Sequence, residues 1–249
     1  MPEWAAFAGF VGVVLVGLLV LARASTDTLD APEFPATLSD RVVEASTDPA
    51  PGASVRRPAA PSTPTLLANV ALSQGAFASL LVVGAWLTGV PAAAVGLATD
   101  AFARPDLLGG VALGVALHVV NAVGSRLTDR FELGDPERLR RAMTPETAVG
   151  WVGLLGVVLP LVAGFEELLF RGVLIGAFAT GFGLSPWLLA GLSSAAFALG
   201  HGAQGRLGIV VSGALGFVLA VGFVLTDSLV TVVIAHYLVN ALEFVVGGR

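Results

Sequence analysis

Seven apolar runs, most of them long enough to cross a lipid bilayer, dominate this 249-residue chain. A helix needs about 20 apolar residues to span the hydrocarbon core. Only 12% of the residues are charged, against about 25% in soluble domains. The runs cover residues 4–22, 66–90, 107–123, 148–180, 184–200, 207–225 and 228–246. They predict an all-α, polytopic transmembrane bundle of seven or eight helices. The expected partner of such a bundle is the lipid bilayer that surrounds it.

The run at residues 148–180 leaves the helix count open. It is too long for one straight span, and Pro160 and Gly164 within it allow a kink or a break. The sequence therefore predicts either one long bent helix or two shorter ones. A β-barrel is disfavoured, because the apolar runs are unbroken and do not alternate over segments of about 10 residues.

The chain divides into three parts. Residues 1–22 are expected to form an N-terminal transmembrane anchor; a cleavable signal peptide is the alternative, although no basic residue precedes the run. Residues 23–65 contain seven of the 14 prolines and six acidic residues, a composition typical of a disordered linker. Residues 66–249 form the expected helical membrane domain.

Charge and cysteine content exclude several classes of function. The net charge is −5 and no basic stripe exists, so nucleic acid is excluded as a partner. The absence of cysteine excludes thiol catalysis, disulfides and cysteine-ligated metals. Residues 124–147 carry five arginines, which favours a cytoplasmic loop of a multi-pass protein in the cell membrane. The mixed charges of residues 23–65 leave the orientation open.

Three charges lie within the longest apolar run. Glu166, Glu167 and Arg171 occur where a charged side chain costs roughly 2.5–3.5 kcal/mol on insertion scales. Glu167 and Arg171 are four residues apart and can pair on one helix face. Glu166 is rotated by about 100° from Glu167 and is left free for another role. The alternative is that all three form a buried ion cluster that only holds helices together.

Three further polar residues lie in the apolar segments of the C-terminal half. His201 follows Phe197 by four residues, and Asn240 follows His236 by four, so each pair shares a helix face. Together with a free glutamate, these groups supply what hydrolysis requires. A carboxylate can act as general base toward water, an imidazole can orient that water, and an amide can stabilise an oxyanion.

His118 and Asn121 form another polar pair, in the third apolar run, three residues apart on one face. Hydrogen bonds between helices are the usual role of such groups in membrane proteins. We expect that role for them, with a place in the wall of a functional site as the alternative.

The order of these motifs resembles the signature of the CPBP family. That family comprises the type II CAAX prenyl endopeptidases and membrane proteins for bacteriocin processing or immunity. The motifs are, in order, Glu166-Glu-x-x-x-Arg171, Phe197-x-x-x-His201 and His236-x-x-x-Asn240. The resemblance covers about residues 148–246 and implies an intramembrane protease that cleaves a membrane-associated peptide or protein.

The resemblance implies a role for each site residue. Glu166 corresponds to the catalytic glutamate that activates water, which His201 helps to hold. His236 and Asn240 correspond to groups that contact the scissile carbonyl and its oxyanion. Glu167 and Arg171 give structural support.

The cofactor is left open by the same resemblance. The family is usually labelled metalloprotease, and Glu166, His201 and His236 could form a zinc set of two histidines and one carboxylate. The chain lacks the His-Glu-x-x-His motif of ordinary zinc proteases. We therefore favour a glutamate-driven mechanism without a tightly held metal.

Two other classes of function compete with the protease. One is a non-enzymatic immunity or scaffold protein of the same fold, in which the polar groups serve packing. The other is a small proton-coupled transporter, with Glu166 and the histidines as a proton relay. Transporters often consist of two related halves with interrupted helices, and no such repeat is evident.

Overall fold

The structure is a computed structural model, and it describes residues 1–29, 62–98, 104–128, 137–202 and 205–247. Within these residues the chain is helical and contains no strand. Six helices are long and apolar enough to cross a membrane, which confirms the predicted helical membrane bundle. Most of the predicted linker, and part of the arginine-rich loop, lie outside the described residues.

The described helices comprise long apolar elements and shorter ones. The long apolar elements are α1 (Trp4–Leu29), α3 (Thr63–Leu87), α4 (Arg104–Thr128), one continuous helix over residues 148–182, α10 (Gly205–Thr226) and α11 (Leu229–Gly247). Shorter elements are the 3₁₀ turn η1 (Ala92–Val95) and the helices α5 (Glu137–Met143) and α9 (Pro186–Gly200).

The long run that the sequence left undecided is one helix, not two. It passes without interruption through five segments: α6 (Ala148–Gly153), the π-helical η3 (Leu154–Val158), α7 (Leu159–Glu167), the π-helical η4 (Leu168–Ala177) and α8 (Phe178–Phe182). Pro160 has no N–H to donate to the preceding turn, and the π-helical η3 lies directly before it. Gly183, with φ +67°, ends the helix in a left-handed cap.

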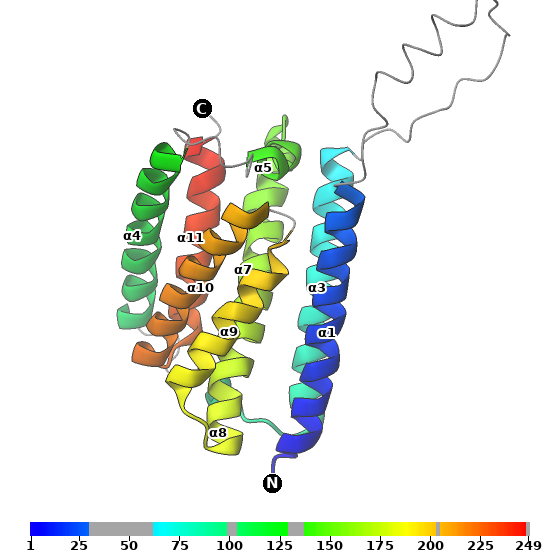
Figure 1. Ribbon diagram of the computed structural model, residues 1–249, viewed down its shortest axis with the longest axis vertical. Coiled ribbons are helices and arrows are strands. Elements are labelled where there is room, and N and C mark those ends of the chain that lie inside the picture. The colour runs from blue at the N-terminus through cyan, green and yellow to red at the C-terminus, as the bar shows by residue number, and fades with distance from the viewer. Residues whose placement is uncertain (30–61, 99–103, 129–136, 203–204, 248–249) are drawn as a thin grey trace, which may run out of the picture.

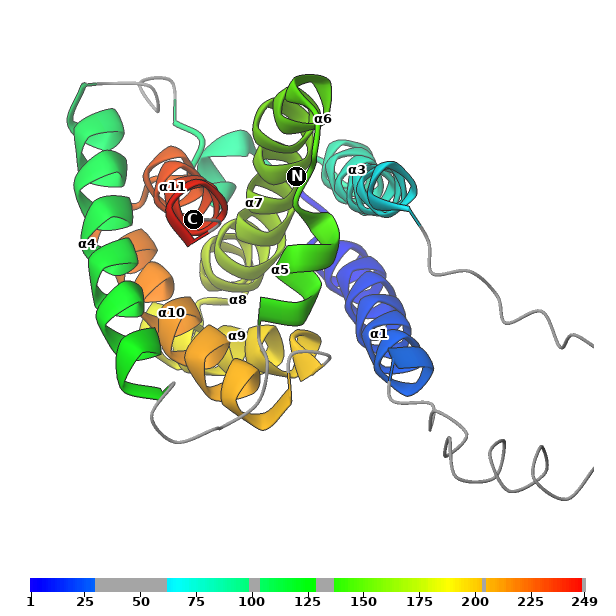
Figure 2. The same cartoon turned by 90° about the horizontal axis from the view of Figure 1, so that it is seen from above.

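The long helix runs through the middle of the bundle (Figures 1 and 2). α3 and α11 pack against α7, and α9 packs against η4. α4 lies along α11 on one side of the molecule, while α1 and α3 lie side by side on the other (Figure 2). The N- and C-termini lie at opposite ends of the bundle (Figure 1).

The N-terminal helix is part of this bundle. Phe7, Val11 and Val14 of α1 are at most 5% exposed, and they lie in one apolar cluster with Phe165 and Leu169 of the long helix. Their spacing of four and three residues places them on one helix face. The segment expected as an anchor therefore also fills part of the core.

The contact between α4 and α11 depends on two glycines four residues apart. A Cβ atom on Gly110 would lie 2.8 Å from Ile234, and one on Gly114 would lie 2.9 Å from the carbonyl oxygen of Ala235. Small residues at this spacing allow two membrane helices to approach closely. The approach fixes α11, which carries two of the candidate site residues.

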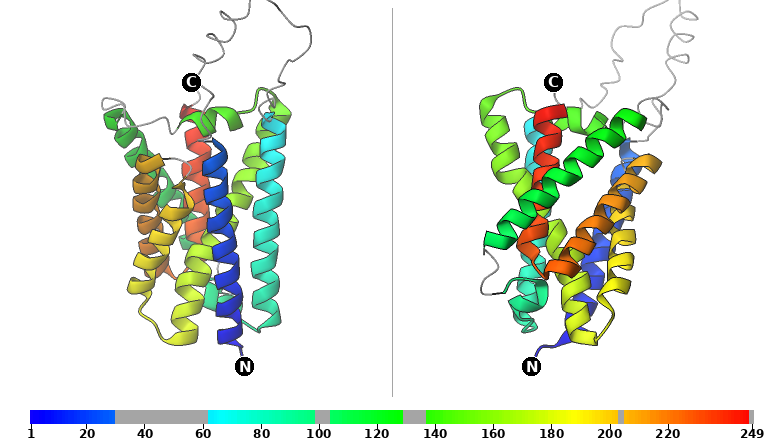
Figure 3. Two further views of the ribbon diagram at one scale, coloured as in Figure 1. Left: turned by 45° about the vertical axis from the view of Figure 1, so that its right-hand side comes forward. Right: turned by 90° about the vertical axis from the view of Figure 1, so that its left-hand side faces the viewer.

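α9 is too short to cross a bilayer. Its 15 residues rise by about 22 Å, less than the roughly 30 Å of hydrocarbon core. It packs side by side with α10 (Figure 3), and His201 is its C-terminal cap residue. The length of α9 therefore keeps His201 inside the bundle.

Candidate active site

A buried ion pair lies at the junction of α7 and η4. Glu167 and Arg171 are both 0% exposed. The guanidinium Nη1 of Arg171 donates to Oε1 of Glu167 at 2.8 Å, and Nη2 donates to the backbone oxygen of Gly216 on α10 at 2.7 Å. The guanidinium carbon lies 4.7 Å from the ring centre of Phe197 on α9. One arginine thus connects the long helix with α9 and α10.

Gly216 provides the space for this arrangement. A Cβ atom there would lie 2.9 Å from the ring of Phe197 and 3.3 Å from Nη2 of Arg171. Contacts below 3.0 Å require a neighbour to move. Glycine at this position lets the carbonyl oxygen of α10 reach the guanidinium.

Glu167 has a second partner, from the last helix. Nδ1 of His236, a residue 3% exposed, lies 2.7 Å from the same Oε1 that accepts from Arg171. An ionised carboxylate only accepts hydrogen bonds, so Nδ1–H of His236 is the donor. Nδ1 thus carries a proton, and Nε2 is the nitrogen that points away from Glu167.

Glu166 lies on the other side of the same imidazole. Its Oε2 is 3.8 Å from Nε2 of His236, which is beyond hydrogen-bond range. This oxygen is buried and has no hydrogen-bond donor among the described residues. The two adjacent glutamates therefore differ: two donors reach Oε1 of Glu167, although its Oε2 is also unpaired, whereas no described donor reaches Glu166 beside the imidazole nitrogen.

His201 is positioned by Phe197, one turn earlier on α9. Nδ1 of His201 lies 2.8 Å from the backbone oxygen of Phe197, and the two rings are 4.3 Å apart between centres. The ring of Phe197 also lies 6.2 Å from that of His236. The phenyl ring thus lies next to both histidines. No described contact joins His201 to Glu166.

Asn240 follows His236 by one turn on α11 and is half-buried. A packing role between helices would require a hydrogen bond from its side chain to a neighbouring helix. Asn240 forms no such bond with the described residues. The structure therefore brings Glu166, Glu167, Arg171 and His236 into one contact network, with His201 reaching it through Phe197 and Asn240 on the adjoining turn.

The polar pair in α4 lies in a separate cluster. Nδ2 of Asn121 donates to Oε1 of Glu243 on α11 at 2.7 Å, and Nδ1 of His118 lies 3.5 Å from the same oxygen. Nη1 of Arg140 on α5 donates to the backbone oxygen of Glu243 at 2.8 Å. Asn121 thus makes the interhelical hydrogen bond expected of it, whereas Nδ1 of His118 lies near Glu243 without a hydrogen-bond partner among the described residues. Glu243 was not singled out by the sequence, because it lies outside the three motifs.

The candidate zinc ligands do not assemble into a metal site. Among the described residues, no three His, Asp or Glu side chains lie close enough together to hold a metal ion. The Nδ1 atoms of His201 and His236 bind a carbonyl and a carboxylate, partners that often orient metal-ligating histidines. Glu166, His201 and His236 are nevertheless too dispersed in this arrangement to fit a three-ligand metal site.

Sequence comparison finds a family model that matches the segment containing this site. The family model described as type II CAAX prenyl endopeptidase Rce1-like matches residues 148–242. No significant match was found among curated proteins or among solved structures. The matched segment contains all three motifs and every residue of the contact network around Glu167. Residues 148–242 of this membrane protein therefore match the model of the Rce1-like family of type II CAAX prenyl endopeptidases, in agreement with the resemblance of its motifs to the CPBP family.

Proposed function

We propose that this protein is an intramembrane endopeptidase, in which Glu166 activates water to hydrolyse a peptide bond of a membrane-associated protein or peptide. The family suggests CAAX protease activity; the mechanism and the roles of individual residues are our proposal. In this proposal the protein crosses the cell membrane several times, with α5 and the arginine-rich loop at residues 124–147 on the cytoplasmic side.

One observation carries the proposal. Oε2 of Glu166 is buried, accepts no hydrogen bond from a described residue and faces Nε2 of His236 at 3.8 Å. Leaving a buried acceptor unpaired costs about 1–3 kcal/mol, and more for a charged group. Glu167 is held through its Oε1 by two donors, although its Oε2 is also unpaired, whereas Glu166 has no donor among the described residues. An unpaired carboxylate oxygen beside an oriented imidazole is suited to accept a proton from water.

The reaction proceeds in two steps. Glu166 takes a proton from a water molecule, whose oxygen forms a bond to the carbonyl carbon of the scissile peptide. The carbonyl π electrons move to the oxygen, and a tetrahedral oxyanion results. The C–N bond then breaks, the electron pair goes to the nitrogen, and the protonated Glu166 delivers its proton to the departing amine.

His236 and Asn240 are proposed to stabilise the oxyanion. Glu167 accepts Nδ1–H of His236 and fixes the plane of the ring, so that Nε2–H of the imidazolium can donate toward the reacting carbonyl. Asn240, one turn further on, offers an amide donor on the same helix face. A preorganised donor of this kind contributes roughly 10²–10³-fold to the rate.

His201 is proposed to hold the attacking water. Its Nδ1 is engaged by the carbonyl oxygen of Phe197, so Nε2 is the nitrogen that remains for water. Because α9 ends within the bundle, the last backbone carbonyls of this helix need polar partners at membrane depth. Water that enters at this end of α9 would satisfy them and would supply the reaction.

The test compares two carboxylate-to-amide changes. Glu166→Gln preserves size but removes the base, so cleavage is expected to fall by roughly 10²–10⁴-fold with folding intact. Glu243→Gln is the matched control, since it neutralises a carboxylate in the same membrane domain but outside the site, and cleavage should remain near the wild-type rate. The substrates are a membrane peptide with an isoprenylated CAAX terminus and the same peptide without the isoprenyl group, in liposomes.

The outcomes separate the competing mechanisms. A Glu166→Gln variant that cleaves as fast as the wild type would refute the general-base role. Activity that survives chelation supports the metal-free mechanism. Activity abolished by a chelator and restored by zinc would instead require Glu166, His201 and His236 to rearrange into a ligand set.

A further inference from the structure

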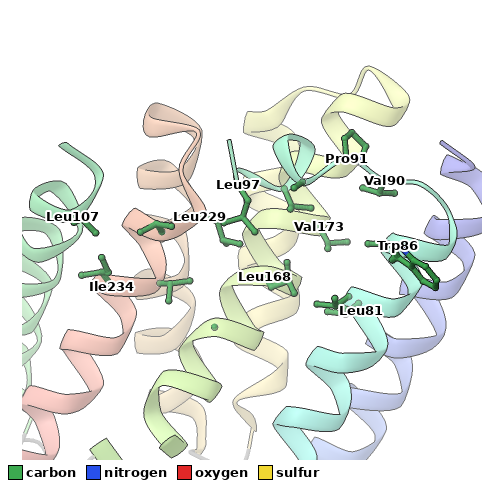
Figure 4. A pocket seen from close by; sticks show the side chains of 17 residues that line it. Leu81, Trp86, Val90, Pro91, Leu97, Leu107, Leu168, Val173, Leu229 and Ile234 are labelled. Atoms are coloured by element: carbon green, nitrogen blue, oxygen red, sulfur yellow. The ribbon is translucent and has the colours of Figure 1, made fainter. Parts of the chain in front are cut away.

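An apolar groove opens on the side of the long helix opposite Glu166. Its volume is about 550 Å³, within the range of ligand-binding sites in proteins. It lies between α3, the long helix and α11, and the segment around η1 closes one end (Figure 4). Gly164 and Leu168 form part of its wall. Each is two residues from Glu166, about 200° around the helix, so the groove and Glu166 lie on opposite faces.

The lining of the groove is almost purely apolar. Among the lining residues that the structure describes, none carries a charged or hydroxyl side chain, and the indole of Trp86 is the single polar side-chain group. A peptide bound here would leave its N–H and C=O groups without partners, at several kcal/mol for each group in an apolar medium. The groove therefore excludes a peptide and accepts a hydrocarbon chain.

At the closed end of the groove, backbone N–H and C=O groups are paired with each other in hydrogen bonds. The N–H of Leu229 donates to the carbonyl oxygen of Gly96 at 2.9 Å, and the N–H of Leu97 donates to that of Ala92 at 3.0 Å. Gly96 has φ +77°, a conformation available to glycine at little cost. This turn ties the start of α11 to the segment after α3, so little polarity remains there to attract water.

The open side of the groove faces the bilayer. Trp86, Val82 and Leu107 line it and are 77%, 57% and 37% exposed. All three belong to helices long and apolar enough to span a membrane. Leu81 and Val173, deeper in the groove, are each 1% exposed. The wall is therefore continuous with the lipid-facing surface, and what surrounds its mouth is lipid.

The space beside Gly164 is open. A Cβ atom on this glycine would have no neighbour within 4 Å, although Ala163 and Phe165 on either side are buried. Protein interiors tolerate few voids larger than a water molecule, and apolar cavities of this kind stay free of water. A hydrocarbon chain is the one abundant component of a membrane that fits such a space.

We propose that this groove binds one hydrocarbon chain of a bilayer lipid, drawn from the leaflet farther from α5, as an integral part of the folded protein. The site is separate from the proposed peptidase site, and the chain within it packs directly against the helix that carries Glu166. A retained chain fills space that the helices leave empty, and its dispersion contacts with α3, α7 and α11 stabilise their packing.

The test measures lipid retention by native mass spectrometry after extensive washing in detergent. The wild type is expected to retain one lipid per chain. Gly164→Phe, which places a ring in the groove, should lower the retained fraction at least tenfold; tenfold corresponds to about 1.4 kcal/mol. Gly156→Phe is the matched control and should retain lipid like the wild type, since Gly156 is exposed on the same long helix and does not line the groove.

A second variant and a photolabelling experiment test whether the loss of lipid from Gly164→Phe reflects misfolding of the protein. Val233→Phe fills the groove from α11 and should reduce retention as Gly164→Phe does. A lipid with a diazirine in its chain should label the half-buried Leu168 in the wild type but not in the filled variants. Labelling confined to outward residues such as Leu72, or equal retention in all variants, would overturn the proposal.

Two other occupants would also overturn it. Displacement of the lipid by an isoprenylated peptide would make the groove a site for the substrate's tail. A dimer that the same two substitutions disrupt would make it an interface between copies of the chain. The measured quantity is lipid content, which is independent of cleavage. Loss of the lipid proposal would therefore not contradict the proposed peptidase activity, and absence of peptidase activity would not contradict lipid binding in the groove.

Discussion

Replacement of Arg171 by alanine is expected to destabilise the folded protein severely. The guanidinium is fully buried, pairs with Glu167 and donates to the carbonyl oxygen of Gly216. Breaking a buried pair from one side typically costs about 3–5 kcal/mol. The unpaired carbonyl of Gly216 and the lost contact with Phe197 place this variant toward the upper end of that range. Whole proteins are stable by only about 5–15 kcal/mol, so little folded protein should remain.

The assay is thermal unfolding of the purified protein in detergent, together with its abundance in the membrane. Arg171→Lys is the first comparison: an ammonium group keeps the charge but lacks the planar fork that reaches two partners, so an intermediate stability is expected. The second is the double change Glu167→Gln with Arg171→Met, which removes both charges. An amide oxygen at position 167 can still accept from Nδ1 of His236, and much of the lost stability should return.

Two results would refute this reasoning. An Arg171→Ala variant with wild-type abundance and unfolding temperature would mean that the pair does not stabilise the bundle. A double variant no more stable than Arg171→Ala would mean that the unpaired charge of Glu167 is not the cause of the damage.

Three further substitutions test other contacts. Gly216→Ala should cost about 1–3 kcal/mol of stability through overpacking against Phe197, whereas Gly191→Ala, whose Cβ meets nothing within 4 Å, should not lower the unfolding temperature; equal effects would show that close packing at α10 is not required. Ser193→Ala removes a buried hydroxyl that donates to a backbone carbonyl of η4 at 2.5 Å and should cost about 1 kcal/mol in denaturant unfolding; an unchanged midpoint would make that bond dispensable. Asn240→Ala should slow cleavage by roughly 10²–10³-fold at an unchanged unfolding temperature, and a normal rate would remove this residue from the proposed site.

Much of the architecture could be predicted because the bilayer restricts what the chain can do. Each long apolar run became a helix, and the helical phase of Glu167 and Arg171 indicated a contact within one segment. The continuity of residues 148–182 could not be predicted, since Pro160 interrupts the usual hydrogen bonding and only the π-helical geometry restores a continuous helix.

The contacts between helices were beyond the reach of sequence patterns. The hydrogen bond from His236 to Glu167 joins residues 69 positions apart, and no periodicity specifies which helices face each other. For the same reason the sequence predicts that Glu167 supports the site but does not indicate that it orients an imidazole. The groove beside Gly164 could not be predicted from the sequence either, because a cavity depends on how three helices diverge in space.

The π-helical geometry of η4 gives this segment the capacity to absorb a deletion. A π turn holds about one residue more than an α turn, so the ten residues of η4 contain more chain than an α-helix of the same number of turns would need. Deleting one residue here, for example Leu174, would allow a return to ordinary α geometry, and the face that packs against α9 would keep its orientation relative to Glu167. The same deletion in an α-helical segment such as α8 would turn everything that follows by about 100°. The wide turns of η4 therefore provide spare length that keeps the two ends of the long helix in register.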